Sequence, residues 1–217
     1  MRPLREDKWA LEFVGRPLIR HIADSLLSSG VCDLLFVGNT SNIETLRHAT
    51  SGLREADCGY AFQLEDSGTA GAIEAAAEHL SGPFLLVNSN DVVEAKAYRM
   101  VLEASAEDCD IALLAARPSR RFPGGRIVVD DRMAVRHIVE KPEPSAEPSD
   151  LVNVGVHYHR DPARLLDALS RVKTDRDERY EAALEFLTNE GAGVQVVPYA
   201  GFSGRMKLPW DLFSVME

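Results

Sequence analysis

Residues 83–93 constrain the fold more than any other part of the chain. Four large apolar residues, Phe84–Val87, run without a polar interruption, and the chain then turns abruptly polar. A strand with one solvated face would alternate apolar and polar residues, so this run predicts a central strand buried on both faces. Asp91 lies in the polar tip, at the carboxyl end of the predicted strand, where open α/β sheets bind their ligands. A carboxylate at such a position is suited to hold a divalent cation against phosphate.

Composition and charge exclude several classes of protein. Of the 217 residues, 45% are hydrophobic and 27% charged, which is typical of one soluble globular domain covering residues 1–217. The formal net charge of −10 argues against a protein that binds nucleic acid or an anionic membrane surface. Cys32, Cys58 and Cys109 are odd in number and far apart, which fits a reducing cytosol, and no apolar run is long enough for a membrane span. We therefore expect a cytoplasmic protein.

Helical and extended patterns alternate along the chain. Apolar stripes of helical period predict helices at residues 18–27, 42–49, 69–80, 93–106, 162–170, 179–190 and 210–216. Short apolar runs predict strands at residues 33–38, 60–64, 83–88, 110–116, 126–129, 134–139, 151–159 and 194–199. Asp130-Asp131-Arg132 between two of these runs indicates a hairpin. The order predicts an α/β fold: a Rossmann-like, doubly wound mixed sheet, mainly parallel, with an antiparallel hairpin annex.

Several segments carry residues with candidate chemistry, and each also has an ordinary structural explanation. Gln63 ends a predicted strand, and Gly68 and Thr69 open the next helix, whose free N–H groups could bind an anion or a base edge. The alternative is an ordinary strand–turn–helix junction. Asp91 could likewise be only the N-cap of the helix that follows it. His157 and His159 share one face of a predicted strand, but two histidines without a third ligand favour a structural role over a metal site.

Taken in order, these segments resemble the sugar-1-phosphate nucleotidylyltransferases, also called nucleoside-diphosphate-sugar pyrophosphorylases. The resemblance covers most of the chain and rests on segments that follow one another in the family's order. They are Arg2-Pro3-Leu4, Lys8 with Gly15-Arg16-Pro17-Leu18, Gln63 with Gly68-Thr69, Asn90-Asp91, Gly125, Glu140-Lys141-Pro142, Asn153-Val154-Gly155 and Leu208-Pro209-Trp210-Asp211-Leu212.

The resemblance implies a reaction. A sugar-1-phosphate oxygen would attack the α-phosphate of a nucleoside triphosphate and release pyrophosphate, which requires alignment and charge neutralisation more than covalent chemistry. It implies that Asp91 holds Mg²⁺ and that Lys8 stabilises the transferring phosphoryl group. Gln63, Gly68 and Thr69 would read the base. Of the residues implied for the sugar-phosphate pocket, Glu140 and Asn153 would take sugar hydroxyls, Lys141 would lie near the phosphate, and Gly125 would line the pocket.

Three departures from the family pattern bear on activity. The family's first strand and its Gly-x-Gly-x-x-Arg phosphate loop have no counterpart here, because the chain begins just after them. Arg205 stands where the family has a second metal-binding aspartate, and an arginine cannot coordinate Mg²⁺, although its fixed charge could partly replace the ion beside phosphate. Asn90 replaces the glycine that precedes the first aspartate.

Two hypotheses of different class follow. In the first, the protein is a nucleotidyltransferase whose native start lies upstream of Met1, with a nucleoside triphosphate and a sugar-1-phosphate as substrates and Mg²⁺ as cofactor. In the second, it is a non-catalytic relative that binds a sugar phosphate, a nucleotide or a partner subunit. The sequence leaves a homo-oligomer open. A sheet without its first strand would expose edges and apolar surface, from which we expect poor solubility.

Overall fold

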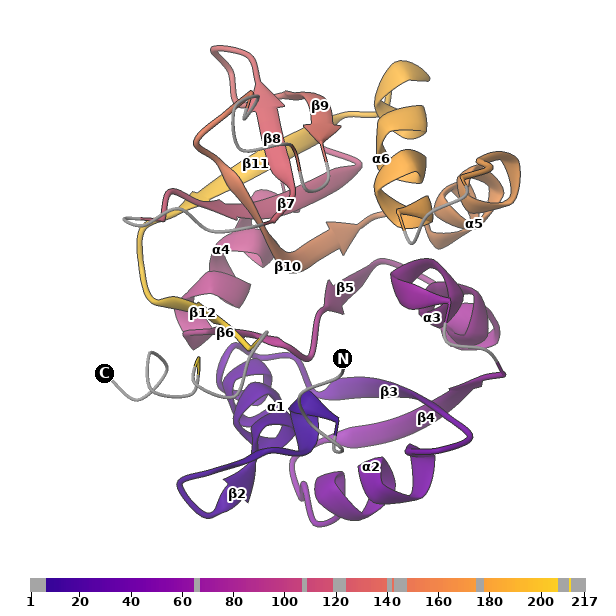
Figure 1. Cartoon of the computed structure of the whole chain (residues 1–217), viewed down its shortest axis with the longest axis vertical. Coiled ribbons are helices and arrows are strands. Elements are labelled where there is room, and N and C mark those ends of the chain that lie inside the picture. The colour runs from indigo at the N-terminus through magenta and orange to yellow at the C-terminus, as the bar shows by residue number, and fades with distance from the viewer. Residues whose placement is uncertain are drawn as a thin grey trace.

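Residues 7–64, 67–106, 109–118, 124–139, 142, 148–174, 178–206 and 211 are described in this computed structural model (Figure 1). The helices are η1 (Lys8–Ala10), α1 (Leu18–Ser28), α2 (Ile43–Thr50), α3 (Gly68–Ala76), η2 (Ala77–His79), α4 (Ala95–Ala104), α5 (Pro162–Arg171) and α6 (Arg179–Asn189). The strands are β1 (Glu12–Phe13), β2 (Arg16–Pro17), β3 (Asp33–Asn39), β4 (Asp57–Gln63), β5 (Phe84–Val87), β6 (Asp91–Val93), β7 (Ile111–Ala116), β8 (Arg126–Val129), β9 (Val135–Val139), β10 (Val152–His159), β11 (Val194–Tyr199) and β12 (Ser203–Arg205).

Local sequence signals set several helix ends. Helix α1 begins directly after Pro17, and Gly30 follows its last turn with a φ of +95°, a left-handed conformation that glycine adopts without a steric penalty. Helix α5 begins at Pro162, and the Asp161 carboxylate accepts hydrogen bonds from the backbone N–H groups of Ala163 and Arg164. These are the proline and N-cap preferences of helix starts. The predicted helix at residues 210–216 lies outside the described residues, apart from Asp211.

Strands β7 and β5 both have apolar contacts on two faces, but β7 is the more deeply buried. All six residues of β7 are buried, and alternate side chains enter two different apolar clusters. All four residues of β5 are partly buried, with Leu85 and Val87 packed against one of these clusters and Phe84 and Leu86 against the other. The apolar run at Phe84–Val87 therefore predicted contacts on both faces correctly, but not full burial. Strand β5 is hydrogen-bonded only to β10 among the described strands, so one of its edges is open.

The largest sheet is mixed and has the order β11-β7-β10-β8-β9, with β5 also paired to β10. Strand β10 runs antiparallel to both β5 and β7, and β11 runs parallel to β7. Strands β5, β7 and β11 therefore share one direction and β10 opposes them. Strands β8 and β9 form the predicted antiparallel hairpin, closed by a turn in which Met133 has a φ of +62°. The predicted α/β, Rossmann-like mixed sheet with its hairpin annex is confirmed. The expectation that the sheet is mainly parallel was wrong for the described part of the large sheet, where the β11–β7 ladder is parallel and the other ladders are antiparallel.

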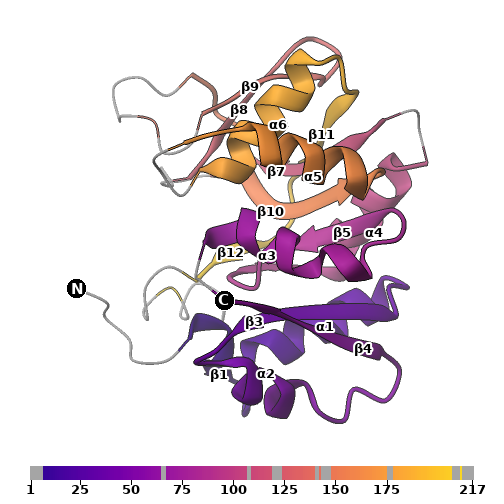
Figure 2. The same ribbon diagram turned by 90° about the vertical axis from the view of Figure 1, so that its right-hand side faces the viewer.

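Strands β3 and β4 form a separate parallel pair, with β3 on the side nearer to β5 (Figures 1 and 2). Within the described chain no ladder joins β3 to β5, so each has one edge without a strand partner. Open edges present unpaired N–H and C=O groups that can pair with another chain. The expectation of poor solubility stays a prediction, as does the expectation of a single domain.

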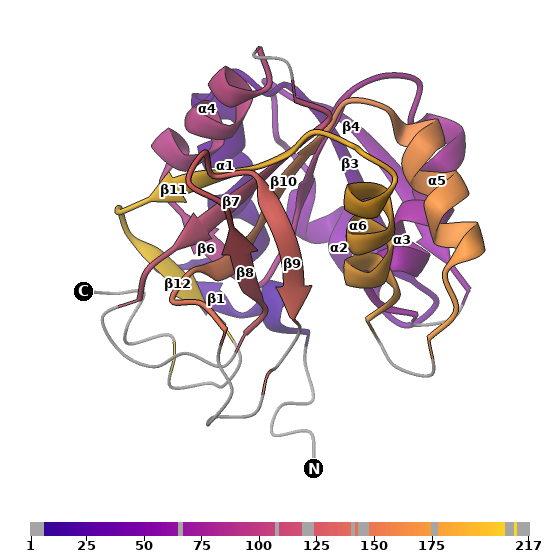
Figure 3. The ribbon, with the colours of Figure 1, turned by 90° about the horizontal axis from the view of Figure 1, so that it is seen from above.

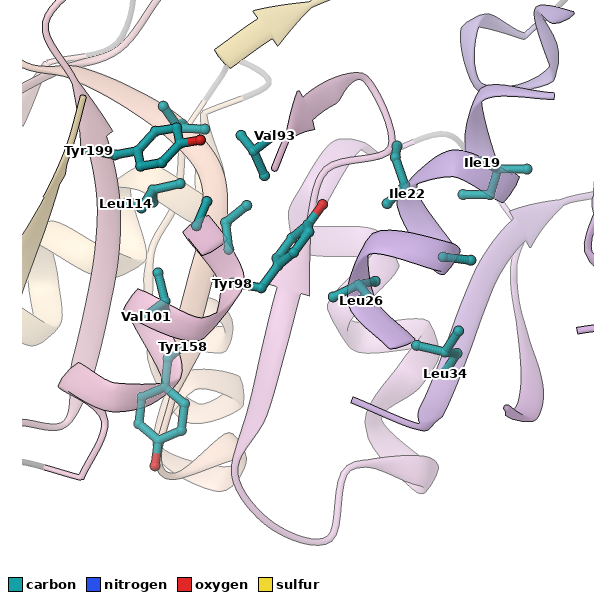
Figure 4. Close-up of a cluster of buried hydrophobic side chains, with 14 of the residues drawn as sticks. Ile19, Ile22, Leu26, Leu34, Val93, Tyr98, Val101, Leu114, Tyr158 and Tyr199 are labelled. Carbon is teal, nitrogen blue, oxygen red and sulfur yellow. The ribbon is translucent and has the colours of Figure 1, made fainter. Parts of the chain in front are cut away.

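Helices cover both faces of the large sheet. Seen from above, α1 and α4 lie to one side of β7 and β10, and α3, α5 and α6 lie to the other side (Figure 3). The first side holds the cluster in Figure 4, where Tyr98 lies between Ile22 and Leu26 of α1 and the sheet residue Leu114. None of the helices in the described part of the chain has the length and apolar character needed to cross a membrane.

Candidate active site

Asp91 begins a short strand at the end of the turn that follows β5. The turn is held locally: the N–H of Asn90 donates to Oδ1 of Asn88 at 3.0 Å, and the N–H of Asp91 donates to the Asn88 carbonyl at 3.0 Å. Asparagine favours such turns because its side chain can bond the backbone two residues on. Helix α4 begins four residues after Asp91 and has Glu94 at its N-cap position. Asp91 is therefore not the cap of that helix, and the alternative reading of this residue was wrong.

The Asp91 carboxylate is buried, and both of its oxygens accept hydrogen bonds. Its exposed fraction is 1%, and it faces the guanidinium of Arg205, with Nε 2.5 Å from Oδ1 and Nη2 2.9 Å from Oδ2. The backbone N–H of Gly155 donates to Oδ2 at 2.8 Å. The pair follows from the register of β6 and β12, in which Asp91 and Arg205 are direct cross-strand partners (Figure 1). A two-point contact of this kind fixes both side chains in orientation as well as distance.

Arg205 joins Asp91 to the strand that carries Asn153. Its Nη2 also donates to the backbone carbonyl of Asn153 at 2.9 Å. The N–H of Asn153 in turn donates to the carbonyl of Gly125 at 2.9 Å. The structure thus brings three of the predicted site residues, Asp91, Asn153 and Gly125, into one connected group through Arg205. Glu140 and Lys141, which the resemblance assigns to the same pocket, lie outside the described residues.

A buried series of hydrogen bonds holds the side chain of Asn153. Oδ1 of Asn153 lies 2.7 Å from Nε2 of His157, Nδ1 of His157 lies 2.7 Å from the Tyr180 hydroxyl, and that hydroxyl lies 2.8 Å from Nε2 of His159. With Oδ1 as an acceptor, neutral His157 donates from Nε2 and accepts from Tyr180, which itself accepts from His159. This assignment satisfies all three contacts of the series, and it leaves the Asn153 amide N–H₂ outside them.

Both histidines are neutral in this arrangement. Burial lowers the pKa of His157 to about 3, and the positive charge of Arg205 adds to the shift. Burial likewise lowers the pKa of His159 to about 3, with a further contribution from His157. Burial also raises the pKa of the Tyr180 hydroxyl well above its usual value. Sequence reasoning gave the histidines a structural role, but nothing in the pattern of α6 indicated that Tyr180 would bond both.

A second group of predicted residues lies on β4 and α3. Gln63 ends β4, Gly68 begins α3 with a φ of +67°, and Thr69 follows it. The Oε1 atom of Gln63 is buried, and among the described residues it has no hydrogen-bond partner. A Cβ added to Gly71 would lie 1.8 Å from Oγ of Ser67 and 3.4 Å from that Gln63 oxygen. Within the described chain, no hydrogen bond connects this group to Asp91 or Asn153.

Lys8 lies in η1, next to the buried Trp9. Helix η1 packs against α1 and α2, on the side of the molecule that carries β3 and β4. The side chain of Lys8 is half-buried. The structure therefore places Lys8 with the N-terminal elements, and not among the contacts of Asp91.

Gly155 is a position where an added methyl group should disturb the site. Its Cβ would lie 2.4 Å from Cβ of Asn88 and 2.6 Å from Oδ2 of Asp91. We expect Gly155→Ala to lower the free energy of unfolding by about 1–3 kcal/mol, the usual cost of overpacking. Gly82→Ala is the matched control, because a Cβ there meets nothing within 4 Å. Urea unfolding of both variants measures the difference, and equal stabilities would contradict the tight contact between Gly155 and Asp91.

The family profile described as nucleotidyl transferase matches residues 3–198. The chain belongs to the nucleotidyl transferase family. This nucleotidyl transferase is 26% identical over 219 residues to the UTP–glucose-1-phosphate uridylyltransferase AglF of Haloferax volcanii, an alignment that covers 97% of this chain and 88% of AglF.

A further curated relative is the bifunctional protein GlmU of Staphylococcus saprophyticus. It is 28% identical over 195 residues, which cover 84% of this chain but only 41% of GlmU. Two solved structures share the fold of this nucleotidyl transferase. Apo UDP-glucose pyrophosphorylase has a TM-score of 0.80 at 15% identity, covering 95% of this chain and 88% of that one. HddC from Yersinia pseudotuberculosis has a TM-score of 0.72 at 17% identity, covering 95% and 87%.

By its family the protein is an enzyme of the nucleotidyltransferase class, linked to nucleotide-sugar biosynthesis. The substrates of that family are a nucleoside triphosphate and a sugar-1-phosphate. Such enzymes commonly use a divalent metal ion. The residues around Asp91 do not fit one. The described residues contain no group of three or more His, Cys, Asp or Glu side chains arranged to hold a metal. Both Asp91 oxygens already accept hydrogen bonds from Arg205 or Gly155, so the prediction that Asp91 holds Mg²⁺ finds no support in its contacts.

Proposed function

We propose that this protein transfers a nucleoside monophosphate from a nucleoside triphosphate to a sugar-1-phosphate and releases pyrophosphate. The observation that carries the proposal is the connected group of Asp91, Arg205, Asn153 and Gly125 within a chain matched to the family over residues 3–198. UTP and glucose 1-phosphate are the first substrates to test, because the AglF relative is named for them. The odd number and wide separation of the cysteines favour a reducing cytosol as its location.

In the proposed reaction an oxygen of the sugar phosphate attacks the α-phosphorus of the triphosphate. A new P–O bond forms there, and pyrophosphate leaves with the electron pair of the bond that breaks. The protein's task is to align the two anions and to offset their charge. The fixed charge of Arg205 and the ammonium of Lys8 are the groups we assign to charge neutralisation. We assign Asp91 the role of holding Arg205 in place.

The remaining roles divide between the two ends of the site. On the sugar side, His157 engages Oδ1 of Asn153, so the amide N–H₂ of Asn153 is the group we assign to a sugar hydroxyl. Glu140 and Lys141 are assigned to the sugar and its phosphate by resemblance alone. On the nucleotide side, we assign base recognition to the buried Oε1 of Gln63, which would accept a hydrogen bond from a base N–H, and to the backbone at Gly68 and Thr69.

Gln63 gives this assignment a direct test. We expect Gln63→Leu to raise the KM for the triphosphate by about tenfold or more, because a base donor would then face an apolar group. The KM for the sugar phosphate should change far less. Gln195→Leu, in β11 on the far side of the large sheet, is the matched control. Pyrophosphate release measured over a range of both substrates provides the constants, and an unchanged triphosphate KM in Gln63→Leu would remove Gln63 from the base site.

A substrate panel tests the function as a whole. The 217-residue protein is mixed with each of the four common nucleoside triphosphates and each of several sugar-1-phosphates, and pyrophosphate is measured. Release that requires both substrates supports transfer. Binding of a sugar phosphate or a nucleotide without any release would instead favour a non-catalytic relative.

A further inference from the structure

Arg205 occupies the position that a cation bound to Asp91 would need. Three oxygens surround its guanidinium: Oδ1 of Asp91 at 2.5 Å, Oδ2 at 2.9 Å and the carbonyl of Asn153 at 2.9 Å. Carboxylate and carbonyl oxygens are also the ligands that hard divalent cations take. The side chain of Arg205 is 18% exposed and that of Asp91 only 2%, so the pair is largely shielded from water. A metal ion bound to Asp91 would lie against the positive charge of Arg205 unless it displaced the guanidinium.

The exchange of a metal for arginine conserves the local charge. A divalent cation held between two carboxylates and an arginine held by one carboxylate each sum to zero. A metal ion can dissociate from its site, whereas a guanidinium keeps its charge at every physiological pH and is covalently part of the chain. The register of β6 and β12 sets this geometry, since position 205 is the direct cross-strand partner of Asp91.

We infer that Arg205 is the permanent cation of this site and that Asp91 takes no divalent metal ion in this chain. The inference rests on the proposed function only for the identity of the phosphorylated ligand. The contacts of Asp91 and Arg205 carry the rest.

Binding of Mn²⁺ to the protein alone tests the inference without substrate or turnover. Free Mn²⁺ has a sharp six-line electron paramagnetic resonance spectrum that is lost on binding, so a titration counts bound ions. Asp91 should bind no Mn²⁺ in the wild-type protein, so the wild type and Asp91→Asn should take up the same amount of Mn²⁺. A wild-type site of one ion per chain that disappears in Asp91→Asn would overturn the inference.

Changing position 205 should create the site that the wild type lacks. Arg205→Asp places two carboxylates directly opposite each other across the β6–β12 ladder, and its affinity for Mn²⁺ should exceed that of wild type by at least about tenfold. Arg205→Gln is the matched control, because it removes the cation without adding a second carboxylate, and it should gain much less. If Arg205→Asp fails to fold, as judged by circular dichroism, the titrations of the wild type and Asp91→Asn still test whether Asp91 binds a metal ion.

Calorimetry with glucose 1-phosphate separates the inference from the proposed function. Its dissociation constant should be unchanged by EDTA and should rise at least about tenfold in Arg205→Gln, because a charge-assisted contact to phosphate is lost. Binding that EDTA abolishes would overturn the inference. Failure of glucose 1-phosphate to bind under any condition would count against the proposed substrate, while the Mn²⁺ titration would continue to test Arg205.

Discussion

Asp91→Asn is expected to lower the free energy of unfolding by about 3–5 kcal/mol, the cost typical of removing one partner from a buried ion pair. Asp91 is 1% exposed and accepts two hydrogen bonds from the guanidinium of Arg205. An amide of the same size keeps the volume but removes the negative charge that faces Arg205. It also offers N–H groups where the guanidinium already donates. Urea unfolding of the wild-type protein and the variant gives the difference.

A double-mutant cycle isolates the contribution of the pair itself. Asp91→Asn, Arg205→Met and the double variant should show a coupling free energy of about 1–3 kcal/mol, as expected for residues in direct contact. The exposed pair Asp167 and Arg171 is the control, with side chains 53% and 58% exposed. Asp167→Asn should cost less than about 1 kcal/mol, because exposed pairs contribute little. Equal small losses at Asp91 and Asp167 would mean that the buried pair does not form.

The second large effect is a loss of stability in mild acid. Burial lowers the pKa of His157 and of His159 in the folded protein to about 3, below the ordinary value for histidine of about 6.5. As the pH falls below about 6.5, the unfolded chain therefore binds protons that the folded chain refuses. The stability from these neutral histidines is fully present above pH 6.5. It is lost progressively as the pH falls toward 3.

The expected size follows from proton linkage. Each histidine contributes a loss of about 2 kcal/mol between pH 7.5 and pH 5, so the two together account for roughly 2–4 kcal/mol when their shared contact with Tyr180 is allowed for. Urea unfolding at several pH values measures the slope. His159→Phe, which keeps a ring stacked beside Phe84, should reduce the slope by up to one proton, whereas the exposed control His48→Gln should leave it unchanged. A slope that His159→Phe does not alter would contradict the assignment.

Much of the fold was predictable because its patterns are local. Three features each follow from residues near one another in sequence: the hairpin around residues 130–132, the apolar stripe of α1 and the start of α5 at Pro162. The incomplete burial of β5 was not predictable in this way. Its four apolar residues suggested a strand buried on both faces, but burial depends on which strands pair beside it. Strand β7 is fully buried because β10 and β11 pair with its two edges, whereas β5 pairs with β10 alone among the described strands.

The sequence predicted which residues belong to the candidate site better than it predicted the contacts between them. Sequence order and resemblance indicated Asp91, Gly125 and Asn153, which the structure connects, and they marked Arg205 as a departure from the family. They did not indicate that Arg205 would bond Asp91 directly, because this contact depends on the register of two strands more than a hundred residues apart. Tyr180 was missed because its contacts depend on how helix α6 packs against the strand that carries His157 and His159, which no local pattern shows.

Transfer of a labelled α-phosphate tests the proposed function most directly. The 217-residue protein is incubated with UTP labelled at the α-phosphorus and with glucose 1-phosphate, and the products are separated by ion-exchange chromatography. We predict that the label appears in a nucleotide sugar, with one pyrophosphate released for each label transferred, and that omission of either substrate abolishes both products. If the protein is folded by circular dichroism and the label stays in the triphosphate for every combination of triphosphate and sugar phosphate tested, the proposal is contradicted.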